Sequence, residues 1–367
     1  MPEFDQVLVV QRPGQVALCE EPVPPLEDGT FRVRTLYSGL SAGTELSFVK
    51  GTNPFLTSRW DTELGLFRPG ESDGYPVSKL GYMQVAVVTA SRAPGVTEGA
   101  TVAMTYGHRT GYVGTPLADR VVPLPADVDP LLGIYAAHMG PICVNGLLHA
   151  AAEAYGADAR SPADGVRGRR VVVTGAGVVG LLTALFARHY GAAEVVLVDP
   201  TPRRRAVVEA FGLEALDPVA DDVAVELKTR WRHGAADRGA DIVFQCRGQA
   251  TSLALGLRLL RPQGSVIDLA FYPGGTEDVR LGEEFHHNGL TIRCAQIGRV
   301  PRGLAHLWDR ERLSAETIDL LCVEGTSIVK HLVTDLVPMT DAPQFYDALA
   351  DRRRHVLQAA FTFDAYL

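Results

Sequence analysis

The chain has 367 residues, which corresponds to about two domains of ordinary size. Hydrophobic residues make up 46% and charged residues 21%, a composition typical of a globular protein with a sizeable core. The formal net charge of −8 argues against a nucleic-acid partner, because binding to phosphates needs a basic surface. Two basic clusters, 203–205 and 352–354, are interpreted as solvated helix faces.

The N-terminus and the cysteines narrow the class of protein further. No positively charged segment followed by an apolar one comes after Met1, so we expect a cytoplasmic protein. The low-charge stretch 171–187 is shorter than about 20 residues and is interrupted by glycines, so we expect no membrane partner. The cysteines are scattered, without a Cys-x-x-Cys pair or a Cys/His ligand spacing. This spacing predicts neither a disulfide framework nor a structural zinc site.

The N-terminal region, to about residue 150, has the pattern of a β domain. Short β-prone segments are separated by proline and glycine turns, and the clearest are 6–10, 31–36, 83–89 and 101–104. Short strands punctuated in this way are typical of a mostly antiparallel, barrel-like sheet. The segment 155–168 is rich in Ala, Asp, Arg and Gly, and it is predicted to be a surface insertion.

Residues 170–199 have the pattern of a strand, a turn, a helix and a second strand. The turn is Gly175-Ala-Gly177-Val-Val-Gly180, between an apolar run and the helical pattern of 181–190. In such a motif the first glycine makes the tight turn, the second lets the backbone approach a pyrophosphate, and the third lets helix and strand pack closely. The second strand ends at Asp199, an acid placed to bind an adenosine ribose. This order predicts a dinucleotide-binding unit, with a plain strand–helix–strand crossover as the alternative.

The phosphates of a dinucleotide are expected on unpaired N–H groups at the positive end of the helix. The residues expected to bind the cofactor are Gly175, Gly177, Val178, Val179, Gly180, Asp199, Arg204, Cys246, Ala270 and Phe271. The charge of Asp199 would repel a 2′-phosphate, so the predicted cofactor is NAD and NADP is the less favoured alternative. Cys246 is interpreted as a small packing residue beside the cofactor, because nothing near it resembles an activating base.

Strands and helices continue to alternate after this unit. Helical patterns cover 203–211 and 251–260, and β-prone runs cover 241–246, 265–270 and 290–294. This alternation predicts an α/β fold with a doubly wound parallel sheet of about six strands.

The C-terminal region, from about residue 313, changes pattern again. It contains a predicted helix, a β-prone piece, a second helix and a final strand, at 315–322, 332–336, 342–351 and 356–363. We expect this tail to fold back on the N-terminal part. The predicted division is therefore 1–151, 152–310 and a C-terminal return of 311–367.

Five further motifs, at 38–45, 80–83, 137–143, 244–248 and 285–293, resemble those of the medium-chain dehydrogenase/reductase superfamily, the zinc alcohol dehydrogenase-like proteins. The resemblance covers nearly the whole chain. It implies a catalytic domain with a chaperonin-10-like (GroES-like) β barrel, a Rossmann domain and a C-terminal return to the first domain. Ser-Ala-Gly-Thr-Glu and His-His-Asn-Gly-Leu-Thr-Ile-Arg resemble the threonine, sorbitol and sugar dehydrogenase subset. A homodimer or homotetramer is expected of such a protein.

The zinc ligands of that superfamily are replaced. The resemblance places Ser41 where the zinc enzymes have a cysteine and Tyr82 where they have a histidine, and His138 falls near the third ligand position. One ligand does not make a catalytic zinc site, which needs about three. The four-cysteine lobe for structural zinc is absent as well, so we expect a zinc-free member. His286 and His287, on a loop before a strand, are interpreted as structural or interface residues.

Without zinc, another group must move the hydroxyl proton and stabilise the developing alkoxide. The resemblance places the motifs of Tyr82 and Glu45 at the substrate cleft, so these are the first candidates for the acid/base. His138 follows, because an imidazole has an ordinary pKa of about 6.5. Lys79 is expected to lower the pKa of a neighbouring tyrosine through its charge.

Each candidate has a structural alternative. Tyr82 is also compatible with a wall residue whose hydroxyl faces water, and Glu45 with a cap of the helix that follows Thr44. His138 is compatible with a hydrogen-bonded core histidine. Ser41 either donates a hydrogen bond to substrate or fills the place of the missing cysteine.

One function is favoured and two alternatives stay open. The favoured function is an NAD-dependent, zinc-independent oxidoreductase that transfers a hydride between nicotinamide and a secondary alcohol or its ketone. The substrate would be a sugar, a polyol or a related hydroxylated metabolite. The first alternative is an NAD(P)H-dependent quinone- or enone-type reductase, the usual activity of zinc-free members. The second is a cofactor-binding protein that has lost catalysis together with its zinc ligands.

Overall fold

The computed structural model describes residues 4–272, 274–277 and 279–366. The chain forms two compact units, one of Met1–His138 with Ile328–Leu367 and one of Met139–Ser327. Each unit has hydrophobic clusters of its own. Within the described ranges, no helix has the length and apolar character needed to cross a membrane.

The first unit is built on a seven-stranded sheet in the order β16-β17-β3-β6-β7-β9, in which β8 also pairs with β3, and on two hairpins, β1–β2 and β4–β5. Its strands are β1 (Phe4–Arg12), β2 (Gln15–Pro22), β3 (Phe31–Gly39), β4 (Ser58–Asp61), β5 (Leu66–Pro69), β6 (Gln84–Ser91), β7 (Thr101–Met104), β8 (Gly111–Gly114), β9 (Val122–Pro123), β16 (Val333–Pro338) and β17 (Gln358–Thr362). Its helices are α1 (Ala42–Val49) and α9 (Ala342–Ala350), with 3₁₀ turns η1 (Pro54–Leu56), η2 (Pro130–Tyr135), η6 (Met339–Asp341) and η7 (Asp364–Tyr366).

A buried ion pair ties the β1–β2 hairpin to the large sheet. Arg32 of β3 donates to both carboxylate oxygens of Asp5 in β1, at 2.7 and 2.6 Å. Thr110 donates to the same carboxylate at 3.0 Å. Both charged side chains are more than nine-tenths buried, so each offsets the desolvation cost of the other.

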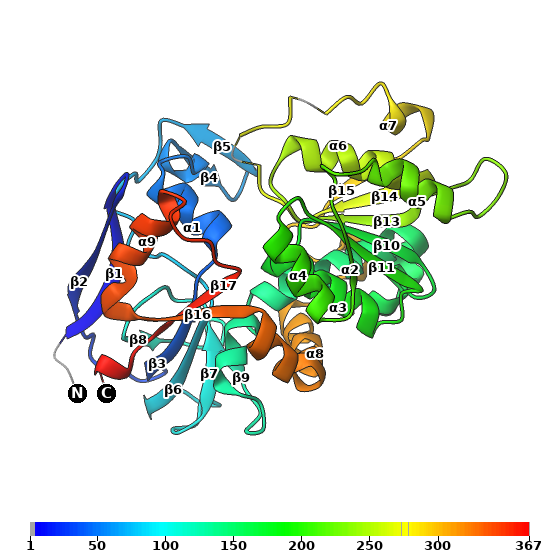
Figure 1. Cartoon of the computed structure of the whole chain (residues 1–367). Coiled ribbons are helices and arrows are strands. Elements are labelled where there is room, and N and C mark those ends of the chain that lie inside the picture. The colour runs from blue at the N-terminus through cyan, green and yellow to red at the C-terminus, as the bar shows by residue number, and fades with distance from the viewer. Residues whose placement is uncertain (1–3, 273, 278, 367) are drawn as a thin grey trace. The chain divides into compact units, whose positions relative to one another are not determined.

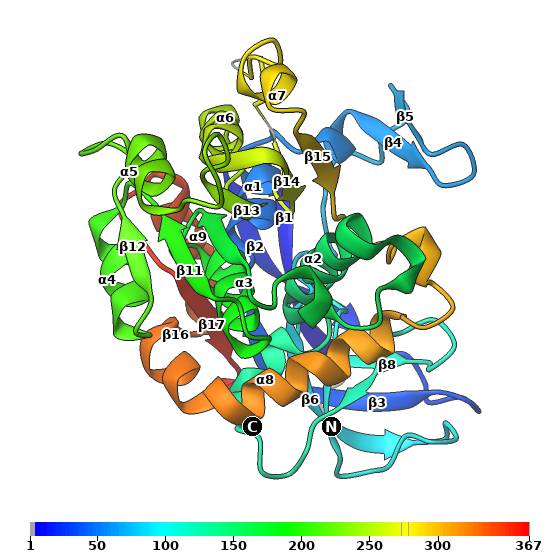
Figure 2. The same cartoon turned by 90° about the vertical axis from the view of Figure 1, so that its right-hand side faces the viewer.

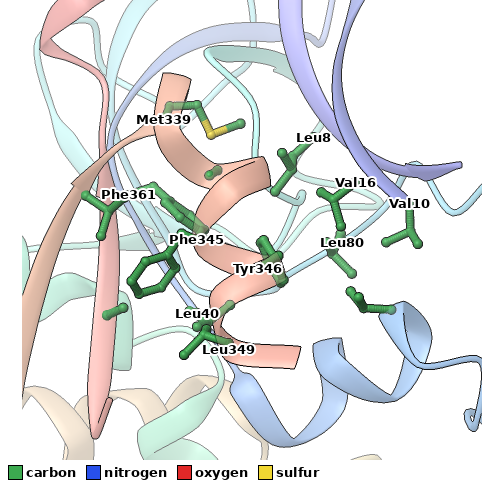
Figure 3. Close-up of a cluster of buried hydrophobic side chains, with 14 of the residues drawn as sticks. Leu8, Val10, Val16, Leu40, Leu80, Met339, Phe345, Tyr346, Leu349 and Phe361 are labelled. Carbon is green, nitrogen blue, oxygen red and sulfur yellow. The ribbon is translucent and has the colours of Figure 1, made fainter. Parts of the chain in front are cut away.

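The C-terminal tail completes the core of the first unit, as Figure 3 shows. The apolar residues of α9 recur three and four positions apart, which gives the helix one buried face. That face contributes Ala342, Phe345, Tyr346 and Leu349. It packs in a cluster with Leu8, Val10, Leu40, Leu80 and Phe361.

The final strand lies inside the large sheet rather than at its edge. β17 pairs antiparallel with β3, with Ala360 opposite Gly39 and Thr362 opposite Tyr37. On its other side it pairs in parallel with β16, and Figure 2 shows these two strands running together. The predicted return of the tail to the N-terminal part is therefore what the fold has, and so is a mostly antiparallel sheet there.

The second unit is a six-stranded parallel sheet in the order β12-β11-β10-β13-β14-β15. Its strands are β10 (Arg170–Thr174), β11 (Glu194–Val198), β12 (Glu214–Leu216), β13 (Ala240–Gln245), β14 (Leu260–Asp268) and β15 (Thr291–Cys294). Its helices are α2 (Met139–Tyr155), α3 (Val178–His189), α4 (Pro202–Ala210), α5 (Val223–Arg230), α6 (Ala250–Leu259), α7 (Glu284–His287) and most of α8 (Arg310–His331), with 3₁₀ turns η3 (Gly156–Asp158), η4 (Pro162–Gly165) and η5 (Arg302–Leu304). This is the predicted α/β fold with a doubly wound parallel sheet, and its strand order is that of a Rossmann fold.

Helices cover both faces of this sheet, which explains why its central strands β10 and β13 have buried apolar residues on both faces (Figure 1). Val172 of β10 packs in a cluster with residues of α5 and α6. The next residue, Val173, points to the opposite face and approaches Gly180 of α3. Successive side chains of a strand alternate between faces, so both need apolar residues here.

The boundaries between the units differ from the predicted ones. They fall at 138/139 and 327/328 instead of 151/152 and 310/311. The reason is that α2 and most of α8 pack within the second unit: Gly140 of α2 lies so close to Thr317 of α8 that a Cβ there would clash. When a helix lies at a boundary between two units, its sequence does not indicate on which of the two units it packs.

The segment 155–168 also differs from the predicted surface insertion. Ala159, Ala163 and Val166 are buried. Gly165 lies against the backbone of α2, where a Cβ would come within 2.6 Å of the Leu147 carbonyl oxygen. The small residues of this segment therefore allow close packing on α2 rather than marking an exposed loop.

Candidate functional site

The glycine-rich turn lies between β10 and α3 in the second unit. Gly175 has a φ of 95°, in the region that favours glycine. A Cβ on Gly180 would lie well under 3.0 Å from the Gly175 carbonyl oxygen, so only glycine lets α3 begin this close to β10. Gly177 is open: the nearest atom to a Cβ built there is Nη1 of Arg204, at 3.9 Å.

An anion fits in front of this turn. Val178 and Val179 open α3, and the first N–H groups of a helix have no partner inside it. The helix dipole adds a partial positive charge at the same end. Open space at Gly177 and free N–H groups beside it are the features that a bound pyrophosphate needs.

Asp199 follows β11 and is bonded to the glycine-rich turn. It is fully buried, and its Oδ2 accepts the N–H of Ala176 at 2.9 Å while Oδ1 accepts the N–H of Thr201 at 2.8 Å. A carboxylate has about four acceptor positions, so two remain for a ligand.

Two arginines of α4 surround Asp199. Arg205 donates to the Asp199 backbone carbonyl at 2.8 Å and pairs with Asp217 at the same distance. Arg204 lies 3.6 Å from the Asp199 carboxylate and is the neighbour of Gly177 noted above. Arg204 is therefore the cation within reach of phosphates at this turn.

The remaining predicted cofactor residues follow the carboxyl ends of β13 and β14. Cys246 comes directly after β13, and Ala270 and Phe271 come shortly after β14. Because β10, β13 and β14 are neighbouring parallel strands, their carboxyl ends lie at one edge of the sheet, the edge of the glycine-rich turn. Burial raises the pKa of the Cys246 thiol well above its ordinary value, so this thiol stays protonated and is not a nucleophile.

In the first unit, three of the four predicted catalytic residues come together. The Ser41 hydroxyl, just before α1, lies 2.5 Å from the Tyr82 hydroxyl. Thr44 lies 3.4 Å from the same phenol oxygen. The rings of Tyr82 and His138 are stacked at a tilt, with centroids 4.5 Å apart. Residues 41, 82 and 138, distant in sequence, thus form one polar cluster.

The Tyr82 hydroxyl has a raised pKa. Burial is the main cause, and the hydrogen bonds from Ser41 and Thr44 offset it only in part. The phenol therefore stays protonated at neutral pH, and its phenolate form is disfavoured by burial. The prediction that Lys79 lowers the pKa of a neighbouring tyrosine is wrong, since the shift of Tyr82 is upward and Lys79, which is exposed, is not among its causes.

Glu45 lies beneath this cluster with its carboxyl group fully engaged. Its Oε1 accepts the backbone N–H of Ser41 at 2.7 Å, which caps the start of α1. Its Oε2 accepts hydrogen bonds from the Tyr346 hydroxyl and from Nε2 of His108, the latter at 2.9 Å. With 1% of its surface exposed, Glu45 has the geometry of the helix-cap alternative.

The bonds to Glu45 belong to a longer buried chain. The Ser38 hydroxyl donates to Nδ1 of His108 at 2.5 Å, and the Gln84 amide donates to Ser38 at 2.9 Å. The side chains of Ser38, Gln84 and His108 are fully buried. They hold Glu45, and through it the N-terminus of α1 that carries Ser41.

The first-unit cluster does not fit the zinc that the sequence resemblance implies. Ser41 and Tyr82 offer hydroxyls that are bonded to each other, whereas protein zinc sites use cysteine, histidine and carboxylate ligands. The Glu45 carboxyl already accepts three hydrogen bonds. In the part of the chain that the structure describes, no group of three or more His, Cys, Asp or Glu side chains is placed to hold a metal ion.

Within the second unit, His286 and His287 lie away from the glycine-rich turn. They end the short helix α7, and both are exposed. Together with Arg261 and Gln263 they line an open cavity of about 1100 Å³. This cavity lies at the first half of β14, whereas the glycine-rich turn lies at the carboxyl ends of the strands. Nothing places them near the cofactor edge of the sheet.

Several polar residues at these sites were not predicted. His108, Tyr346, Ser38 and Gln84 are far apart in sequence, and no spacing indicates that they meet. Two others had a signal: Gln245 and Asp268 are polar residues at the ends of otherwise apolar β-prone runs. A polar residue at the carboxyl end of a predicted parallel strand points to the ligand-binding edge.

The parallel sheet and the glycine-rich turn have the arrangement of a Rossmann fold, and comparisons with known proteins support this fold. The family model for zinc-binding dehydrogenases matches residues 178–310. D-guloside 3-dehydrogenase of Escherichia coli (strain K12) is 24% identical over 349 residues, or 94% of this chain and 96% of the relative. L-galactonate-5-dehydrogenase of the same strain is 25% identical over 375 residues, or 97% and 98%.

A candidate zinc-binding dehydrogenase of Sinorhizobium meliloti 1021, bound to NADP, has a similar structure, with a TM-score of 0.73 and 18% identity over 99% of this chain and 100% of that one. These matches confirm the resemblance to the medium-chain dehydrogenase/reductase superfamily and show that the chain has its fold. The family model covers the nucleotide-binding part and contains none of Ser41, Tyr82 and His138.

Two glycine substitutions should separate the fold from the cofactor site. Gly180→Ala places a methyl group against the Gly175 carbonyl and should lower the free energy of unfolding by about 1–3 kcal/mol. Gly177→Ala meets no close atom, so its thermal midpoint should equal that of wild type while its affinity for NADH falls at least tenfold. Thermal melts and NADH titrations measure both. Wild-type NADH affinity in Gly177→Ala would contradict the placement of the pyrophosphate.

Proposed function

We propose that this protein is an NAD-dependent, zinc-independent oxidoreductase that transfers a hydride between nicotinamide and a secondary alcohol or its ketone. The observation that carries the proposal is the open turn at Gly177 with the Asp199 carboxylate bonded beside it. The glycine-rich turn and the start of α3 would hold the pyrophosphate, and Asp199 the adenosine ribose. The polar cluster of Ser41, Tyr82 and His138 supports a catalytic role for the first unit.

In ketone reduction the bound nicotinamide supplies the hydride, and the protein must supply a proton to the carbonyl oxygen. Tyr82 is the proposed donor, because its hydroxyl carries a proton at neutral pH and lies against the Ser41 hydroxyl, with the His138 ring beside the Tyr82 ring. Ser41 would then hydrogen-bond the phenolate that remains. In alcohol oxidation the same proton returns to Tyr82. Glu45, buried and engaged, is proposed to position Ser41 rather than to transfer the proton itself.

The proposed substrate is a hydroxylated metabolite of the sugar or polyol type. Two relatives are named as dehydrogenases of a guloside and of galactonate, and the likeness covers nearly the whole of both proteins. A protonated phenol beside a serine hydroxyl suits a substrate whose reacting oxygen changes between alcohol and ketone. The identities of 24% and 25% support the class of substrate and not one compound.

NAD should bind more tightly than NADP. A 2′-phosphate would lie against the buried Asp199 carboxylate, and the nearby Arg204 offsets only part of this repulsion because it is already 3.6 Å from that carboxylate. We expect NADH to bind about 10–100-fold more tightly than NADPH in calorimetric titrations, and Asp199→Ala to reduce this ratio. Arg204→Ala should weaken NADPH more than NADH. Equal or tighter NADPH binding by wild type would refute the preference, and the NADP-bound relative makes that comparison necessary.

The purified protein should hold no stoichiometric zinc and should keep its activity in chelator. The basis is the hydroxyl pair of Ser41 and Tyr82 at the two positions matched to zinc ligands. Elemental analysis after dialysis is expected to find well below one zinc per chain. About one tightly bound zinc per chain would overturn this part of the proposal and make His138 and Glu45 the ligands to examine.

Tyr82→Phe should lower turnover by roughly 10²–10⁴-fold and leave NADH binding unchanged. Because the protonated form acts in ketone reduction, that activity should stay level through neutral pH and fall only above the ordinary tyrosine pKa of 10.0. The matched control is Tyr112→Phe, at a residue of β8. This substitution also removes a tyrosine hydroxyl of raised pKa, and that hydroxyl donates to Asp119 and not to Ser41. The control should keep both rate and profile. Near-normal turnover in Tyr82→Phe, Glu45→Gln and His138→Ala alike would place the active site elsewhere.

The two alternative functions make different predictions in one assay. Polyols, sugar acids, glycosides and enones are each supplied with NAD⁺ or NADH, as the direction of the reaction requires. Turnover confined to enones would favour the reductase. NADH binding without turnover on any of these compounds would favour a protein that binds the cofactor without catalysis.

A further inference from the structure

A chain of hydrogen bonds joins the carboxyl ends of three neighbouring strands, β10, β13 and β14. It begins at Thr174, the last residue of β10, whose hydroxyl donates to Oε1 of Gln245 at the end of β13. The Gln245 amide donates to the Arg247 carbonyl at 2.6 Å and to the Tyr272 hydroxyl at 3.1 Å. Tyr272 in turn donates to Oδ2 of Asp268, at the end of β14, at 2.9 Å.

In each hydrogen bond of this network the donor and the acceptor are defined. The two amide hydrogens of Gln245 are both used, and its oxygen accepts from Thr174. The second oxygen of Asp268 accepts the backbone N–H of Ala270 at 2.9 Å. Thr174 and Gln245 are fully buried and Asp268 is 8% exposed. A buried network with all its members satisfied holds its parts in one arrangement.

The network controls two backbone turns that pack on each other. Gln245 holds the turn after β13 through the Arg247 carbonyl, and Asp268 holds the loop after β14 through the Ala270 N–H. Where the two meet, a Cβ on Gly248 would lie well under 3.0 Å from the Phe271 carbonyl oxygen. Small shifts in either turn would therefore move the other.

These turns belong to one half of the cofactor site. In a sheet of this strand order the dinucleotide lies across the carboxyl edge, with one mononucleotide on each half. Asp199, after β11, assigns the adenosine end to the half formed by β10, β11 and β12. The turns after β13 and β14 are therefore next to the nicotinamide end.

We propose that Tyr272, with Asp268 and Gln245, is a positioning residue that holds the turns 246–248 and 269–271 in the shape required by the nicotinamide half of the cofactor. The inference rests on the proposed dinucleotide function. Holding the turns before binding removes the entropy cost of ordering them when the cofactor arrives. The network therefore acts on the nicotinamide half and leaves the adenosine half unaffected.

Calorimetric titration with two probes, NADH and ADP-ribose, tests this proposal on the full chain. ADP-ribose has the adenosine, the pyrophosphate and one further ribose but lacks the nicotinamide ring. In Tyr272→Phe the NADH dissociation constant should rise about tenfold or more, since a buried partner is left unsatisfied. The ADP-ribose constant should change less than twofold, which also shows that the variant is folded.

The matched control is Tyr190→Phe. Its hydroxyl also donates to a carboxylate, that of Glu316, but it caps the opposite, C-terminal end of α3. This control should bind both probes as wild type does. A second variant, Asp268→Asn, keeps an acceptor for the Ala270 N–H and should weaken NADH binding less than Asp268→Ala.

Two results would overturn the proposal: unchanged NADH affinity in Tyr272→Phe, or equal weakening of NADH and ADP-ribose. The second result would mean that the network supports the whole unit and not the nicotinamide half. Failure of the dinucleotide site on which the inference rests looks different, because wild type itself would then bind neither probe.

Discussion

The second unit depends on a contact that only a glycine allows. The Gly175 carbonyl oxygen occupies the space that a side chain on Gly180 would need. Because the two backbones can touch, α3 starts directly behind β10, and its free N–H groups face the same edge of the sheet as Asp199. The open turn at Gly177, the bond from Ala176 to Asp199 and the packing of Val173 all depend on this one approach.

In the first unit the corresponding constraint is a buried carboxyl group. The carboxyl group of Glu45 holds Ser41, whose hydroxyl contacts Tyr82. Glu45 accepts hydrogen bonds from the Ser41 backbone, from His108 and from Tyr346, residues of three separate parts of the chain. A buried acceptor that loses one donor keeps its desolvation cost, so the three partners are mutually dependent. The position of Ser41, and with it the Ser41–Tyr82 pair, thus depends on residues that are buried away from the surface.

Local patterns were enough to predict the fold class and the meeting of the glycine-rich turn with Asp199. The apolar run before Gly175 and the acid at Asp199 stand in strict order along the chain, so their meeting in space follows from the βαβ geometry alone. The unit boundaries could not be predicted in this way, because the sequences of α2 and α8 do not indicate on which unit each helix packs. The partners of Glu45 were missed for a related reason: His108 and Tyr346 lie 63 and 301 residues away, and only the folded sheet brings them near. The direction of the Tyr82 pKa was missed because burial, which a sequence does not display, outweighs any nearby charge.

The place of β17 within the large sheet has a consequence for synthesis. The second unit, Met139–Ser327, is complete in the nascent chain before residues 328–367 have been made. Until they emerge, β3 lacks its neighbour and Glu45 lacks the Tyr346 hydroxyl. Residues 139–327 can therefore fold early, while the sheet of the first unit keeps an open strand edge until residues 328–367 are made, and an open strand edge is a state in which chains pair wrongly with one another. A chain that stops within residues 328–367 would leave this edge of β3 open.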